Sequence, residues 1–243
     1  MGDMASAGDK LTRRQASDAV TGLGWRYLLG MLCTCVRAGS LRRAGELAAQ
    51  LAAAHDDAGD SLRLDVRGER LFITLYSATT AATTRETELA RRISAFVGTL
   101  GLATDPQVGA TGRQVGGAGA ARSAQVVEIG IDALDIAAIR PFWMAIMGYQ
   151  DEVLPAGPQD PLVDAFGQWP SIWFQQMDAP RTQRNRIHFD ICVPHDEAQR
   201  RIAAALAAGG RLSYDAEAPA FWVLADPEGN EACITTWQGR DPV

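Results

Sequence analysis

Residues 125–238 contain the same order of predicted elements twice, and this duplication is the strongest constraint on the fold. In each copy an apolar strand is followed by a helix that closes at glycine, and then by three short strands. The first copy runs from Gln125 to Gln176 and the second from Arg186 to Trp237. A half-sheet with one helix leaves an apolar face that a second copy can cover. We therefore predict paired βαβββ modules that form a cupped sheet around a central cavity.

The stretch from Thr104 to Ser123 is rich in glycine, alanine and polar residues and has almost no large apolar side chain. Such a stretch cannot bury enough surface to order itself, which predicts a flexible linker at residues 103–123. The linker separates a domain at residues 10–102 from one at 124–240. The first domain shows helical patterns interspersed with strands. We predict an α/β sandwich there, with helices on one face of an antiparallel sheet, and an α+β class for the chain.

Composition and charge exclude several classes of partner. The formal net charge is -6, so a nucleic-acid or anionic-membrane surface, which needs clustered basic residues, is not expected. The sequence contains no run of roughly 18 apolar residues and no signal-peptide pattern at its start. We therefore expect a cytoplasmic protein. The four cysteines lack metal-type spacing and are expected to be free thiols.

Four motifs in the second half point to a known family: VVEIGID (126–132), FWMAIMGY (142–149), RIHFDICV (186–193) and ADPEGNEACI (225–234). With these motifs, residues 125–238 resemble the vicinal-oxygen-chelate superfamily, particularly its glyoxalase-like branch. The resemblance implies that four inner strands each present one side chain to a divalent metal at the bottom of a cup. Two vicinal oxygens of the substrate would complete the coordination. It also implies a homodimer.

The resemblance places Glu128 and His188 at two of the metal-ligand positions, as implied catalytic and metal-binding residues. The other two positions fall at Trp173 and Cys233. Trp cannot ligate a metal and a lone thiol suits softer ions, so a divalent metal is implied only by a weakened ligand set. The alternative is a pocket histidine without a metal, hydrogen-bonded to Glu128 or to Asp190, which shares its strand face.

Aromatic side chains are concentrated in the second half and favour a ligand cavity with flat apolar walls. At least one of Trp173 and Trp222 is expected to line the cup, although each could equally fill the core. Gln175 lies two residues beyond Trp173 and therefore shares its strand face. The predicted ligand-binding residues are Trp173, Gln175, Asp190, Trp222 and Cys233.

The first half resembles pterin-4a-carbinolamine dehydratase through LTRRQASDAVTGLGW, AGELAAQLAAA, LRLDVRGERLFITLYS and ETELARRISAF. That family carries a His-His-Pro and a His-Asp that act as acid and base. Here these positions fall at Asp60-Ser61-Leu62 and at Ala78-Thr79, and His55 is the one histidine of this half. We predict a dehydratase-like fold that lacks the catalytic histidines.

Three functions follow as expectations. The first is a glyoxalase-like enzyme, of lyase or isomerase type, in which Glu128 acts as base or ligand and His188 as ligand or acid. The second is a protein that binds or sequesters a small molecule without turnover. The third is 4a-hydroxytetrahydrobiopterin dehydration by the first half, against which the missing histidines argue.

Overall fold

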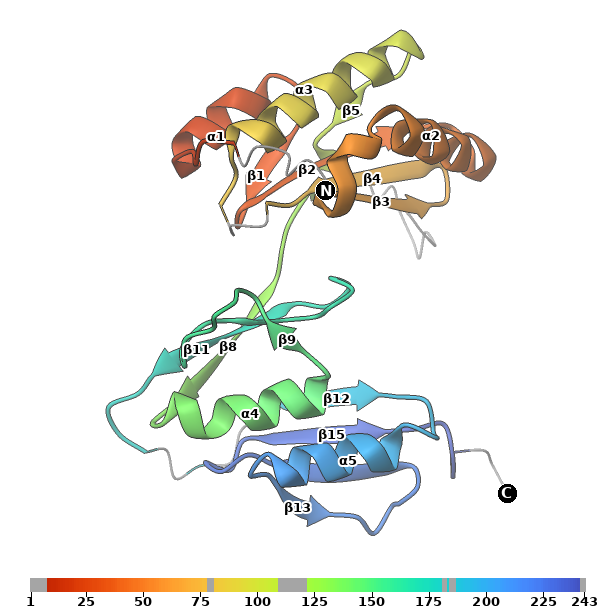
Figure 1. Cartoon of the computed structure of the whole chain (residues 1–243). Coiled ribbons are helices and arrows are strands. Elements are labelled where there is room, and N and C mark those ends of the chain that lie inside the picture. The colour runs from red at the N-terminus through yellow and green to blue at the C-terminus, as the bar shows by residue number, and fades with distance from the viewer. Residues whose placement is uncertain (1–7, 78–80, 109–121, 181–182, 184–186, 241–243) are drawn as a thin grey trace, which may run out of the picture. The chain divides into compact units, whose positions relative to one another are not determined.

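The computed structural model describes residues 8–77, 81–108, 122–180, 183 and 187–240. The chain divides into two compact units, Met1–Val126 and Val127–Val243. Each unit combines helices with sheets of antiparallel or mixed strands, in agreement with an α+β class (Figure 1). None of the helices in the described residues is long and apolar enough to cross a membrane.

The first unit contains an antiparallel sheet in the order β1-β2-β4-β3. The short strand β5 pairs with Cys35 and Val36 of β2, beyond the residues of β2 that pair with β1. Its elements in chain order are α1 (Arg13–Thr21), β1 (Arg26–Leu28), β2 (Met31–Arg37), α2 (Leu41–Ala54), the 3-10 helix η1 (Asp56–Ser61), β3 (Leu62–Arg67), β4 (Arg70–Leu75), α3 (Thr84–Thr99) and β5 (Thr104–Asp105).

The three helices of this unit lie on one face of the sheet (Figure 1). Thr12 and Thr83 each begin a helix with a capping box, and the side chain of Ser40 accepts from the backbone amide of Arg43 at the start of α2. The apolar faces of helices and sheet share one core, which includes Val20, Leu51, Leu71, Ile73 and Ile93. The helix starts follow from local sequence, and burial of these side chains holds the layers together.

The predicted linker is shorter than the sequence indicated. Thr104 and Asp105 pair with β2, so they belong to the sheet of the first unit. Next, β6 (Gln107–Val108) pairs with β7 (Arg122–Ser123). The predicted flexibility of residues 109–121 concerns positions outside the described residues.

The second unit shows the duplication directly. The first module contains β8 (Glu128–Ala133), α4 (Ile136–Met147), β9 (Gln150–Asp151), β10 (Leu162–Val163) and β11 (Ser171–Gln176). The second contains β12 (Phe189–Cys192), α5 (Ala198–Ala207), β13 (Arg211–Tyr214), β14 (Phe221–Ala225) and β15 (Glu231–Thr235). The strand orders are equivalent, β8-β11-β10-β9 and β12-β15-β14-β13. In both modules the first strand runs parallel to the last.

Among the described strands, each of the two paired modules makes its own four-stranded sheet. The two modules share a core to which both sheets and both helices contribute, including Ile131, Phe174, Ile202, Leu224 and Ile234. Each sheet turns one face toward this core. Since alternate strand residues point to opposite faces, the remaining side chains lie on outer faces that are available to ligands.

Polar contacts also fasten one module to the other. The carboxylate of Glu228, in the turn before β15, accepts hydrogen bonds from the backbone amides of Leu134 (2.9 Å) and Asp135 (2.7 Å) ahead of α4. Arg201 on α5 donates to the carbonyl of Ile146 on α4 at 3.1 Å. Glu228 of the ADPEGNEACI motif thus binds the backbone that leads into α4 of the other module.

Candidate functional site

The outer face of the second sheet brings together three side chains that can bind a cation. His188 directly precedes β12, Asp190 lies on β12, and both are exposed, whereas Phe189 and Ile191 between and beyond them pack against the core. Asp190 is the register partner of Cys233 on β15. Parallel pairing of β12 with β15 therefore places a buried thiol beside an exposed imidazole and carboxylate.

The donor atoms of His188, Asp190 and Cys233 all lie within 4.8 Å of one another. His188 Nδ1 is 3.2 Å from Asp190 Oδ1 and 3.7 Å from Cys233 Sγ. Ligands of a tetrahedral zinc ion are separated by about 3.4–3.6 Å, as its bond lengths require. The separations and the chemistry of the three donors thus fit a borderline divalent cation.

Glu128 lies on the other sheet and is not a member of this group. Its carboxylate accepts a hydrogen bond from the hydroxyl of Ser171 on β11 at 3.1 Å. Among the described side chains, no hydrogen bond or ion pair joins Glu128 to His188. The metal pair expected from the sequence, Glu128 with His188, is therefore not the set that converges, because the two modules form separate sheets.

Trp173 and Gln175 lie on the outer face of the first sheet, on β11, and Trp222 does not share their environment. Trp173 is 38% exposed and its ring lies over Gly130, the register partner on β8. Trp222 is 9% exposed and belongs to the core cluster. Of the two tryptophans expected to line a cavity, Trp173 is thus on an outer face and Trp222 is a core residue.

Glu152 is a candidate that the sequence did not single out. Burial, reinforced by the nearby carboxylates of Glu128 and Asp160, raises the pKa of Glu152 above its ordinary value. Its backbone amide donates to the carbonyl of Pro161 at 3.3 Å, just before β10. No local motif marks this residue, because its proximity to Glu128 depends on how β8 and β9 are placed in one sheet.

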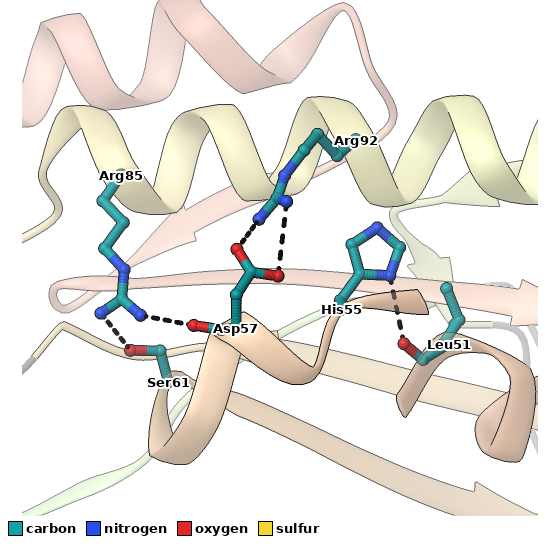
Figure 2. Close-up of polar contacts among 6 residues, drawn as sticks. All are labelled: Leu51, His55, Asp57, Ser61, Arg85 and Arg92. Atoms are coloured by element: carbon teal, nitrogen blue, oxygen red, sulfur yellow. Dashed lines mark hydrogen bonds and ion pairs between the residues drawn. The ribbon is translucent and has the colours of Figure 1, made fainter. Parts of the chain in front are cut away.

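The first unit holds a polar network that joins η1 to α3 (Figure 2). Arg85 on α3 donates to the hydroxyl of Ser61 (3.4 Å) and to the carbonyl of Asp57 (2.9 Å). Arg92, about two helix turns further along α3, pairs with the Asp57 carboxylate at 2.7 Å. The hydrogen bond from Arg92 lowers the pKa of Asp57. This network joins η1 to α3. Because its pKa is lowered, Asp57 is a weaker base than an ordinary aspartate.

Burial excludes His55 from acid–base chemistry on a ligand. It is 5% exposed, and its Nδ1 lies 3.1 Å from the carbonyl of Leu51 (Figure 2). Its ring meets the ring of Phe96 edge-on. The predicted His-Asp position, Ala78-Thr79, falls among residues that the structure does not describe. The described part of the first unit therefore contains no exposed histidine.

Comparison with known proteins finds that residues 128–235 match the family model described as a glyoxalase-like domain. No curated protein matches the chain. A glyoxalase/bleomycin resistance protein/dioxygenase family enzyme from Burkholderia phytofirmans is 22% identical, with a TM-score of 0.37, covering 45% of this chain and 95% of that one.

Fosfomycin resistance protein FosX from Listeria monocytogenes is 12% identical, with a TM-score of 0.38, covering 49% of this chain and 95% of that one. A variant of that protein, solved with Mn(II) and a dihydroxypropylphosphonic acid, is 13% identical, with a TM-score of 0.37. It covers 47% of this chain and 90% of its own.

Proposed function

We propose that the second unit is a glyoxalase-like small-molecule enzyme, of lyase or isomerase type, whose reaction centre includes His188, Asp190 and Cys233. The family match over residues 128–235 supports the general class. The observation that carries the proposal is the convergence of an imidazole nitrogen, a carboxylate oxygen and a thiol sulfur within 4.8 Å. Three such donors on one sheet face form a polar centre at which a substrate oxygen could be held.

The cofactor we propose for this centre is a divalent cation of borderline softness, such as Zn²⁺. His188, Asp190 and Cys233 would hold it, since imidazole, carboxylate and thiolate are all zinc ligands and their spacing suits tetrahedral coordination. When bound, such an ion supplies Lewis-acid polarisation of a substrate oxygen.

Proton transfer is assigned to the carboxyl groups of the first sheet. Glu128 is exposed and keeps the role of base, with the Ser171 hydroxyl donating to its carboxylate. Glu152 has a raised pKa, so it retains a proton to higher pH than an ordinary glutamate. A carboxyl group with a raised pKa, near a second carboxyl group, suits general acid–base chemistry. We expect Glu128→Gln to reduce turnover while binding of the cation at His188 is unchanged.

Cobalt substitution tests the proposed cation centre. Co²⁺ bound by a thiolate gives charge-transfer absorption in the near ultraviolet, and tetrahedral Co²⁺ absorbs strongly in the visible. We expect both signals in the wild-type protein, loss of the near-ultraviolet signal in Cys233→Ser, and weak binding in His188→Ala. Cys192→Ser is the matched control, because Cys192 is an exposed free thiol on β12, the strand that pairs with β15. Absence of stoichiometric binding, or a thiolate band that survives Cys233→Ser, contradicts the proposal.

A second candidate, binding or sequestration without turnover, is favoured by the exposed ring of Trp173 on the first sheet. Flat apolar ligands stack on such a surface. Ligands found by thermal shift would be incubated with the cobalt- or zinc-loaded protein and followed by mass spectrometry. Recovery of every bound ligand unchanged favours sequestration, and conversion that Glu128→Gln abolishes favours the enzyme. Dehydration by the first unit is not proposed, because His55 is buried and Asp57 is held by Arg92.

A further inference from the structure

A hollow of about 700 Å³ opens on the outer face of the second sheet, beside the centre described above. It is lined by Ser213, Tyr214, Glu217, Phe221, Val223 and Glu231. Val223 on β14 is the register partner of Cys233 on β15. The lining and the three cation-binding side chains therefore occupy neighbouring positions on one sheet face.

One wall of the hollow is aromatic. The rings of Tyr214 and Phe221 stack with centroids 5.9 Å apart and an interplanar angle of 23°. The face of an aromatic ring carries negative electrostatic potential, so it attracts an ammonium or guanidinium group. Val223 adds an aliphatic floor. The wall thus offers apolar contact together with a preference for positive charge.

A carboxylate lies at the end of this wall. Oε1 of Glu217 is 3.4 Å from the hydroxyl of Tyr214, which donates to it. Arg211 also borders the lining, through a hydrogen bond to Ser213 at 3.1 Å, but it begins β13, whereas Glu217 follows the strand's other end. The end of the hollow next to the aromatic rings therefore carries the carboxylate of Glu217, and Glu231 adds a second carboxylate to the lining.

Hydrogen bonds hold the turn that carries Glu217 against the sheet, so the backbone at Glu217 is fixed in position. The carbonyl of Glu217 accepts from the amide of Ala220 at 2.8 Å. Thr236, just after β15, donates its hydroxyl to the carbonyl of Pro219 at 2.6 Å. Arg240 donates to the carbonyl of Thr236 at 2.8 Å. A turn held in this way positions its charge before a ligand arrives, which lowers the ordering cost of binding.

We propose that this hollow binds organic cations: molecules in which an ammonium group is attached to a flat or apolar body. The ammonium would lie between the Glu217 carboxylate and the faces of Tyr214 and Phe221. As an assignment of substrate class, this inference rests on the proposed function, since the ligand would lie beside His188, Asp190 and Cys233. Anionic ligands such as phosphonates are disfavoured there, because a carboxylate repels them.

The test uses the metal-free full-length protein and isothermal titration with three benzyl compounds. Benzyltrimethylammonium is the cationic probe, benzyl alcohol the neutral one and benzylphosphonate the anionic one. We expect benzyltrimethylammonium to bind at least about fivefold more tightly than either other probe, because it can contact both a carboxylate and the faces of two aromatic rings. Glu217→Gln should remove most of this preference. Phe221→Leu should weaken binding of benzyltrimethylammonium about threefold. Glu46→Gln, on α2 of the first unit, is the charge-matched control and should have no effect.

Equal binding of the three probes, or cation binding unchanged in Glu217→Gln, overturns the inference. The variant Cys233→Ser distinguishes this inference from the proposed metal centre. In that variant we expect the affinity for benzyltrimethylammonium to be unchanged, while the near-ultraviolet cobalt band is lost. Glu217→Gln should conversely keep the cobalt band. A protein that binds the ammonium probe but no Co²⁺ would therefore contradict the proposed reaction centre and support the hollow.

Discussion

The indole Nε1 of Trp143 donates a hydrogen bond to Oδ2 of Asp226 at 3.0 Å, and both residues are almost completely buried. Trp143 lies on α4 of the first module, and Asp226 precedes the last strand of the second. The same carboxylate accepts from the amides of Glu228 (2.9 Å) and Asn230 (2.8 Å) and from the Asn230 side chain (2.8 Å). One buried carboxyl group thus shapes a turn and joins the two modules.

Replacement of Asp226 is expected to destabilise the second unit strongly. Asp226→Ala leaves the Trp143 indole and two backbone amides without their acceptor, and an unsatisfied buried donor costs about 1–3 kcal/mol. We expect a loss of about 3 kcal/mol in the free energy of unfolding. Urea denaturation followed by tryptophan fluorescence measures it, with Asp178→Ala as an exposed control. A loss below about 0.5 kcal/mol, the range of ordinary surface substitutions, contradicts this role.

Gly130 makes room for the ring of Trp173. A Cβ at Gly130 would lie 3.1 Å from two carbons of that ring, closer than ordinary van der Waals contact. We expect Gly130→Ala to displace the indole and to change its exposure to water. Acrylamide quenching of tryptophan fluorescence detects this, with Trp173→Phe used to identify the contribution of that ring. Quenching identical to that of the wild-type protein would show that the ring does not need the space.

Gly45, unlike Gly130, has room for a side chain. It lies within α2, and a Cβ placed there meets nothing within 4 Å. Glycine inside a helix costs about 0.5–1 kcal/mol relative to alanine, because its unfolded state is more flexible. Gly45→Ala should therefore stabilise the first unit by about that amount, with a higher Tm in calorimetry. An unchanged or lower Tm contradicts the expectation.

The pair of Asp57 and Arg92 predicts a pH dependence for the first unit. The pKa of Asp57 is lowered in the folded protein, chiefly by the hydrogen bond from Arg92. Its stabilising contribution is therefore present above the ordinary value of 3.8 and is lost as pH falls through the lower, folded value. Because the pair is exposed, the contribution is below about 1 kcal/mol.

Denaturation at several pH values tests this pair. Asp57→Asn should reduce stability at neutral pH, and its difference from the wild-type protein should shrink as the solution becomes strongly acidic. Asp65→Asn, which removes an exposed partner of Arg67, is a control for loss of one carboxylate in the same unit. A difference for Asp57→Asn that is constant across the acidic range contradicts the assigned pKa shift.

The sequence by itself determined the local elements. The Ser40 cap marks the start of α2, and Gly148, with its positive φ, marks the end of α4, because capping depends on the residues at hand. The repeated βαβββ order also followed from periodicity alone, since hydrophobic spacing distinguishes strand from helix.

Tertiary structure decided which side chains meet. Cys233 contacts His188 because β15 pairs in parallel with β12, and long-range pairing of this kind is not encoded in local spacing. Glu128 lies on the other sheet, near Glu152, whose pKa is raised by burial and further by the carboxylates of Glu128 and Asp160. Trp173 and Trp222 have similar local patterns, yet the first is on an outer face and the second in the core. Register fixes the face of every strand residue, and register is set only when the strands pack.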